Sequence, residues 1–127
     1  MTSIKFTIQG RIPSKKNSVI LLCRGPRVMK FPSKAYKIWH EDASWQLKSF
    51  YASKALFPLK QISSMIIKIF APDKRSADLS NKVESIMDLL VDNGILKDDN
   101  WFIVPNLLVI FCGIDKDNPR AEVEIKF

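Results

Sequence analysis

The sequence predicts one α+β domain over residues 1–127, in which a mixed β-sheet is accompanied by two helices. A chain of 127 residues has the length of one compact domain, and its 46% hydrophobic residues can supply a core. Its apolar pattern gives the order strands, helix, strand, helix, strands, without repeats or a linker. This order is typical of an α+β sheet domain.

A strand and a hairpin are expected in the N-terminal part of the chain. Residues 3–9 alternate apolar and polar side chains, as a half-buried strand does. The Pro, Ser and Asn residues of segment 10–18 predict a loop. Residues 19–23 and 27–31 are expected to pair as a short hairpin around a Gly-Pro turn.

The first helix is expected to begin after Ser33, a good N-cap residue, and to run to about residue 51. Its apolar residues form a broad stripe, so we expect them to share burial. They are Tyr36, Ile38, Trp39, Ala43, Trp45, Leu47 and Phe50. All three tryptophans, Trp101 included, are assigned to the core or to a contact with a second chain.

The second half of the chain begins with a strand at residues 64–71, which is rich in Ile and Met. A helix is then expected to begin at Ser80 or Asn81 and to end near Asn93 and Gly94, because Gly commonly stops a helix. The residues at core-facing helical spacing are Leu79, Val83, Ile86 and Leu90.

Two further strands are expected after this helix. Residues 101–114 predict a long apolar strand, in which Pro105 indicates a bulge or a sheet edge. A turn at 115–119 leads into a last strand at 121–127, where apolar and charged residues alternate.

Charge is distributed unevenly along the chain, whose net charge is +7. Residues 1–60 contain 12 Lys or Arg and two acids, whereas residues 61–127 contain 8 Lys or Arg and 11 acids. The basic part would be explained if it binds a polyanion, and the acidic part would be explained if it holds a metal ion. The alternative is a solvated surface with no partner.

Several classes of protein are disfavoured by the sequence. No apolar run reaches the roughly 18 residues of a membrane helix, and the N-terminus lacks a signal segment, so a cytoplasmic protein without membrane contact is expected. A structural zinc site needs about four Cys or His ligands. The chain contains two cysteines and one histidine, which are too few.

Acidic residues gather around the second helix. Asp78 stands just before it, and Asp98 and Asp99 occupy the turn that follows it. Residues at i, i+4 and i+8 share one helix face, and here they are Ser80, Glu84 and Asp88. In a two-helix sheet domain the turn can return close to the start of the helix. These carboxylates would then supply the hard oxygen ligands that Mg²⁺ prefers, and such an ion activates water and stabilises charge on a phosphate.

Each acid also has a purely structural interpretation. Asp78 suits the positive end of the helix dipole. Glu84 could close a capping box with Asn81. The 98–100 turn is ordinary turn chemistry, and Asp88 could be a solvated helix residue. Their combination beside a basic half is what favours a metal site.

The segment at 72–84 reads Pro-Asp-Lys-Arg-Ser-Ala-Asp-Leu-Ser-Asn-Lys-Val-Glu. It resembles the segment of the RusA family of Holliday-junction resolvases in which a basic loop precedes Asp-Leu-Asp-Asn. Segments 88–90 and 93–99 are similar to the family's Asp-Ala-Leu helix, Gly turn and closing Asp-Asp pair. Segment 13–17 is similar to its N-terminal Pro-and-Asn loop. The most specific part of the likeness is 78–99.

The resemblance implies a homodimer that cuts four-way DNA junctions with Mg²⁺, using three acids and a nearby lysine. Asp78 matches the first acid and Asp99 the third. Ser80 stands where the second acid is expected, and Glu84 stands at the lysine position. We hypothesise that Glu84, one turn from Ser80, replaces the missing acid. Lys82, one turn from Asp78, would replace the lost positive charge.

The resulting hypothesis is a Mg²⁺-dependent endodeoxyribonuclease that resolves Holliday junctions or other branched DNA in recombination and repair, with Mn²⁺ as the alternative metal. The family suits a phage or prophage origin. Asp78, Asp99, Glu84 and Asp98 would hold the metal ion, and Lys82 would steady the phosphate. The alternatives are a catalytically impaired protein that binds branched DNA and a structural protein with a basic face.

DNA binding is assigned to the basic residues of the N-terminal part and of the loop before the second helix. Phosphate contacts of this kind need no sequence information from the DNA. The residues are Lys15, Lys16, Arg24, Arg27, Lys30, Lys74 and Arg75.

Overall fold

The computed structural model describes residues 2–14, 19–25, 27–51 and 56–127. Its elements are β1 (Ser3–Gln9), β2 (Val19–Arg24), β3 (Arg27–Pro32), α1 (Lys34–Tyr51), β4 (Ser64–Ala71), α2 (Leu79–Asp92), β5 (Leu107–Ile114) and β6 (Arg120–Lys126). This order confirms the predicted α+β fold, a mixed sheet with two helices.

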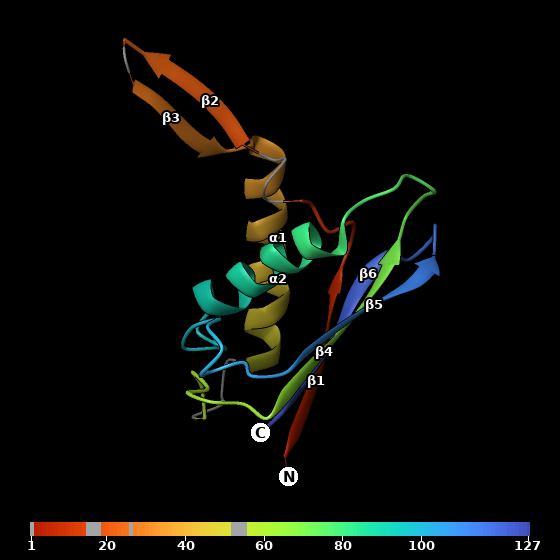
Figure 1. Ribbon diagram of the computed structural model, residues 1–127. Coiled ribbons are helices and arrows are strands. Elements are labelled where there is room, and N and C mark those ends of the chain that lie inside the picture. Colours follow the sequence, from red (N-terminus) through yellow and green to blue (C-terminus); the bar gives the residue numbers. More distant parts are fainter. Residues whose placement is uncertain (1, 15–18, 26, 52–55) are drawn as a thin grey trace.

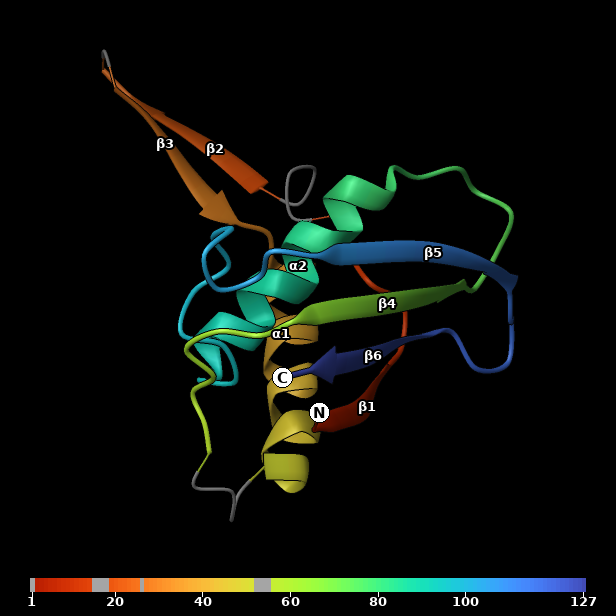
Figure 2. The ribbon, with the colours of Figure 1, turned by 60° about the horizontal axis from the view of Figure 1, so that its bottom comes forward.

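Four of the strands form one sheet in the order β1-β6-β4-β5. β6 is antiparallel to both of its neighbours, whereas β4 and β5 are parallel. A parallel pair needs a crossover connection, and α2 lies within it. Both helices lie on the same face of the sheet, so the opposite face is left open (Figure 1, Figure 2).

The core lies between the sheet and the helices. In β6, Ala121, Val123 and Ile125 are buried, and the charged residues between them are only partly covered. Ile67 of β4 is paired with Val123 on one side and Val109 on the other, so one apolar layer crosses the sheet. Burying one such side chain fully contributes about 1.5–3 kcal/mol. The alternation predicted for the last strand is confirmed.

α1 begins as predicted, because the backbone N–H of Tyr36 donates to Ser33 Oγ at 3.1 Å. The expected burial along α1 is only partly right. Ile38 and Trp45 are 59% and 64% exposed, because only one face of the helix can lie against the sheet. In the described part of the chain, no helix combines the length and the apolar character needed to cross a membrane.

α2 begins at Leu79, slightly before the predicted start, with Asp78 as its N-cap residue. Ile86 and Leu90 are fully buried as expected, but Leu79 is 37% exposed because it lies at the free end of the helix. The polar residue Ser85 is also fully buried. It marks the side of α2 that faces the N-terminal loop.

β5 is shorter than the predicted strand at 101–114. The side chain of Asn100 closes a turn there, since its Oδ1 accepts hydrogen bonds from the N–H groups of Phe102 and Ile103 at 3.0 and 3.2 Å. Regular pairing with β4 therefore begins only at Leu107. β5 lies at the edge of the sheet, as Pro105 suggested, and its outer side pairs with no strand among the described residues.

The predicted hairpin is confirmed as an arm of two strands, β2 and β3, that projects from the body of the molecule (Figure 1, Figure 2). Arg24 and Arg27 are paired at its tip, and Lys30 lies further along β3. These three proposed DNA contacts therefore lie on the arm. Lys15 and Lys16 lie outside the described residues.

Candidate active site

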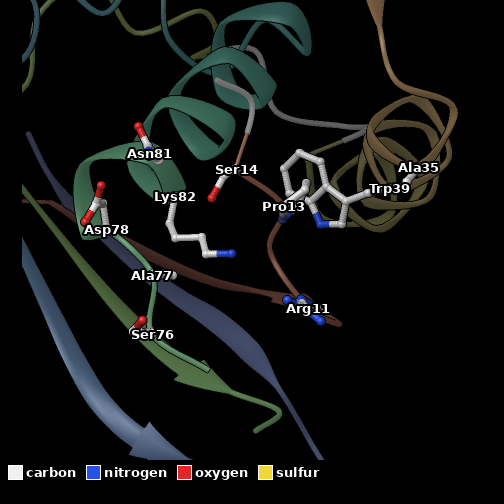
Figure 3. Close-up of a pocket in the computed structure, with 10 residues that line it drawn as sticks. All are labelled: Arg11, Pro13, Ser14, Ala35, Trp39, Ser76, Ala77, Asp78, Asn81 and Lys82. Carbon is white, nitrogen blue, oxygen red and sulfur yellow. The ribbon is translucent and has the colours of Figure 1, made fainter. Parts of the chain in front are cut away.

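A hollow of about 710 Å³, called here the Asp78 pocket, lies where the loop after β1, α1 and the start of α2 meet (Figure 3). It is lined by Arg11, Pro13, Ser14, Ala35, Trp39, Ser76, Ala77, Asp78, Asn81 and Lys82. Two hydrogen bonds of 2.6 Å fasten the loop to α2. Lys82 Nζ donates to the carbonyl of Ile12, and Ser85 Oγ donates to the carbonyl of Pro13.

Asp78 has the extended backbone of an N-cap residue, with φ −83° and ψ 127°. Its carboxylate nevertheless makes no capping hydrogen bond to α2. Helix capping by the side chain therefore does not explain why an acid stands at this position. The carboxylate lies on the wall of the pocket instead, where it is accessible to a ligand (Figure 3).

Lys82 is the second predicted site residue in the pocket. Its side chain runs from α2 toward the middle of the hollow (Figure 3). Burial and the positive charge of Arg11 lower the pKa of Lys82, and Asp73 opposes them. Asp78 and Lys82, one helical turn apart, thus line the same pocket.

Glu84 does not join them in the same chain. It is exposed and does not line the pocket. Glu84 stands two positions after Lys82, which turns it about 200° around the helix axis. The suggested capping box with Asn81 is wrong, because α2 begins at Leu79 and Glu84 lies beyond its first turn.

Asp99 lies near the other end of α2. Burial, then the hydrogen bond and charge of Asp98, and also the charge of Asp88 raise the pKa of Asp99. Asp88 follows Asp78 by ten residues, which is about 15 Å along a helix. Figure 1 shows the turn after α2 at the end of the helix remote from its N-terminus. One chain therefore keeps Asp78 and Asp99 apart.

The side chain of Asp98 stabilises the turn in which it lies. Its carboxylate accepts hydrogen bonds from the backbone N–H of Asp99 at 2.7 Å and from Asn100 Nδ2 at 3.2 Å. The first of these bonds lowers the pKa of Asp98. In the described part of the chain, no group of three or more Asp, Glu, His or Cys residues could hold a metal ion. Among the described residues, a single chain therefore does not gather the four acids that the sequence assigned to the metal ion.

The basic loop before α2 borders the pocket. Arg75 is held by Asp73 through bonds of 3.1 Å from Nε and 2.9 Å from Nη2, so part of its charge is neutralised. Lys74 is exposed and has no ion pair with any residue that the structure describes. Of the two, Lys74 is the stronger candidate for a phosphate contact.

Arg11 and Trp39 are pocket residues that the sequence did not single out. Arg11 belongs to the basic N-terminal part, but nothing in its neighbours distinguishes it from other surface arginines. Trp39 was assigned to the core or to a chain contact, since an aromatic residue on a helix is usually packed. Arg11 and Trp39 are recognised as pocket residues only when the contacts between distant segments of the chain are known.

The acids at the end of α2 also affect Tyr36, which is buried. Burial, with the charges of Asp88 and Asp92, raises the pKa of Tyr36 to about 12 from the ordinary 10.0. Between these pH values the folded protein keeps a proton that the unfolded chain loses, so stability falls as pH rises. Denaturant unfolding across this window is expected to show a smaller fall for Tyr36→Phe than for the wild type. Equal falls would contradict the assignment.

Comparisons with known proteins give a family match for most of the chain. The family model described as Endodeoxyribonuclease RusA matches residues 13–126. A protein named Crossover junction endodeoxyribonuclease RusA, from Aquifex aeolicus (strain VF5), is 26% identical over 91 residues. That match covers 72% of this chain and 68% of the relative.

Proposed function

Because the chain belongs to the RusA family of endodeoxyribonucleases, we propose that it cuts Holliday junctions or other branched DNA with the help of Mg²⁺ or Mn²⁺. The observation that carries the proposal is the Asp78 pocket, whose lining includes one carboxylate, that of Asp78, and two cations, Arg11 and Lys82. Cations of this kind bind a phosphate, and the carboxylate is suited to a divalent ion beside it.

A complete metal site would need acids from two chains, because a single chain separates Asp78 from Asp99. We therefore propose that the active form is a homodimer in which Asp99 of one chain approaches Asp78 of the other. Its supporting observation is the edge strand β5, which has no charged residue from Leu107 to Ile114. Leu108 and Phe111 are each 54% exposed there. An apolar, unpaired edge of this kind favours pairing with another strand.

Antiparallel pairing of two β5 strands about a twofold axis would place the start of one beside the end of the other. The 98–103 turn precedes the start of β5, whereas Leu79 shares an apolar hollow of about 400 Å³ with Phe111 and Ile114 near its end. In the turn, Trp101 and Phe102 are 77% and 75% exposed. They would fill that hollow in the partner, and Asp99 would move toward the partner's pocket.

The test is to incubate the protein with a synthetic four-way junction in Mg²⁺, in Mn²⁺ and in EDTA. Strand cleavage that needs the metal ion supports the proposal. The second candidate is a catalytically impaired protein that binds branched DNA, which is favoured by Ser80 at the position of the family's second acid. Tight junction binding without cleavage in either metal would establish that candidate instead.

Lys74→Ala is expected to weaken binding to all DNA sequences alike. Because one phosphate contact is lost, the slope of log affinity against log salt should become shallower by about 0.9. Lys68→Ala is the matched control, since Lys68 is an exposed residue of β4, paired with Glu122 of β6 and Ile110 of β5, and does not line the Asp78 pocket. Fluorescence anisotropy at several salt concentrations measures both. If the slope is unchanged in Lys74→Ala, Lys74 does not contact a DNA phosphate.

A further inference from the structure

The α1 side of the Asp78 pocket contributes no carboxylate to the described lining. Arg11 and Trp39 line this side, opposite Asp78 (Figure 3). At about 710 Å³ the pocket is also within the size range of small-molecule sites, roughly 300–1,000 Å³. The space beside the acid is therefore large enough for a whole nucleotide.

The pocket has an excess of positive charge. Lys82 forms no ion pair with the residues that the structure describes, and its ammonium group donates to the carbonyl of Ile12. Arg11 approaches only one described carboxylate, that of Asp73, at 3.8 Å. The same carboxylate binds Arg75 at 2.9 Å. An anion between Arg11 and Lys82 would relieve their mutual repulsion, and a phosphate has the charge and the acceptor oxygens for it.

Trp39 supplies an aromatic wall on the same side of the pocket as Arg11 (Figure 3). Its indole reaches from α1 into the pocket, and on α1 itself it packs against Tyr36 with ring centroids 5.8 Å apart (Figure 3). Trp39 Nε1 is buried and has no hydrogen-bond partner in the described part of the chain. Indole rings are stacking platforms for nucleobases, because every base has a π-face.

We propose that the Asp78 pocket is a nucleotide subsite, in which the phosphate of an unpaired nucleotide lies between Arg11 and Lys82 and its base stacks on Trp39. This inference rests on the proposed DNA substrate. A base inside a duplex is already stacked and paired, so it must be turned out to reach Trp39. A branch point holds such bases at a lower cost. The subsite therefore favours branched over continuous DNA.

Tryptophan emission tests the subsite without any cleavage. The wild type, Trp39→Phe and Trp45→Phe are titrated in EDTA with a four-way junction and with a duplex of equal length, and anisotropy reports saturation. Trp45 is the matched control, since it lies on the same helix but is 64% exposed beside Lys48, away from the pocket. Phenylalanine keeps an aromatic ring at either position, so both variants should fold.

The junction is expected to quench emission more than the duplex does in the wild type and in Trp45→Phe, and this difference should disappear in Trp39→Phe. A saturating junction with no such difference, or a difference that survives in Trp39→Phe, would overturn the subsite. Since no metal ion is present, a protein that quenches but never cuts keeps the subsite and loses the proposed activity. A protein that cuts the junction without this quenching keeps the proposed activity and loses the subsite.

A second variant measures the effect on affinity. Trp39→Leu removes the stacking surface, so its affinity for the junction is expected to fall by about tenfold while its affinity for the duplex stays unchanged. Equal losses for both kinds of DNA would show that Trp39 only supports the fold, and would contradict the subsite.

Discussion

Asp78→Asn is expected to lower the rate of junction cleavage by about three orders of magnitude, or about 4 kcal/mol of transition-state stabilisation. The amide keeps the shape of the side chain but removes the negative charge that a divalent cation needs. Folding should not suffer, because the carboxylate makes no capping bond and Asn is as good an N-cap residue as Asp. Single-turnover cleavage, thermal unfolding and junction binding in EDTA together measure these effects.

Glu84→Gln is the comparison for this result. If Glu84 replaces the missing second acid, this variant should lose cleavage almost as fully as Asp78→Asn does. The structure places Glu84 outside the pocket of its own chain, so such a loss would require it to act in the partner's site. Normal cleavage by Glu84→Gln, together with an inactive Asp78→Asn, would show that the substitution hypothesis is wrong. If Asp78→Asn still cuts the junction at the normal rate, the Asp78 pocket is not the site of cleavage.

Mixing two inactive variants is expected to restore cleavage. Asp78→Asn and Asp99→Asn should each be inactive as homodimers. If chains exchange at random, roughly half of the dimers are mixed. When a site takes Asp78 from one chain and Asp99 from the other, a mixed dimer has one site with both acids intact and one with both replaced. The intact site should nick one strand of the junction.

The arrangement of the acids decides the outcome of this experiment. If both acids of a site came from the same chain, every site in a mixed dimer would carry one substitution, and the mixture would stay inactive. Native mass spectrometry confirms that mixed dimers have formed. An inactive mixture that contains them, or a protein that is a monomer at the concentrations that cut DNA, would rule out the shared site.

Local patterns in the sequence were sufficient for most of the fold. The alternation in β1 and β6 and the Ser33 cap predicted elements that the structure contains, because these signals depend on residues within one or two turns of each other. Errors arose where packing decides. Ile38 and Trp45 are as apolar as buried residues, but α1 has only one face against the sheet. The strand predicted from residue 101 was shortened by the side chain of Asn100.

The candidate site divides in the same way. The sequence by itself determined that Asp78 and Lys82 both lie at the start of α2, because four residues make about one helical turn. Only the tertiary structure decided that Arg11 and Trp39 join them, since hydrogen bonds from Lys82 and Ser85 bring the N-terminal loop to α2 across about 70 residues. It also decided that Asp99 stays away in a single chain. The rigid length of α2 fixes that separation, and a sequence motif carries no record of it.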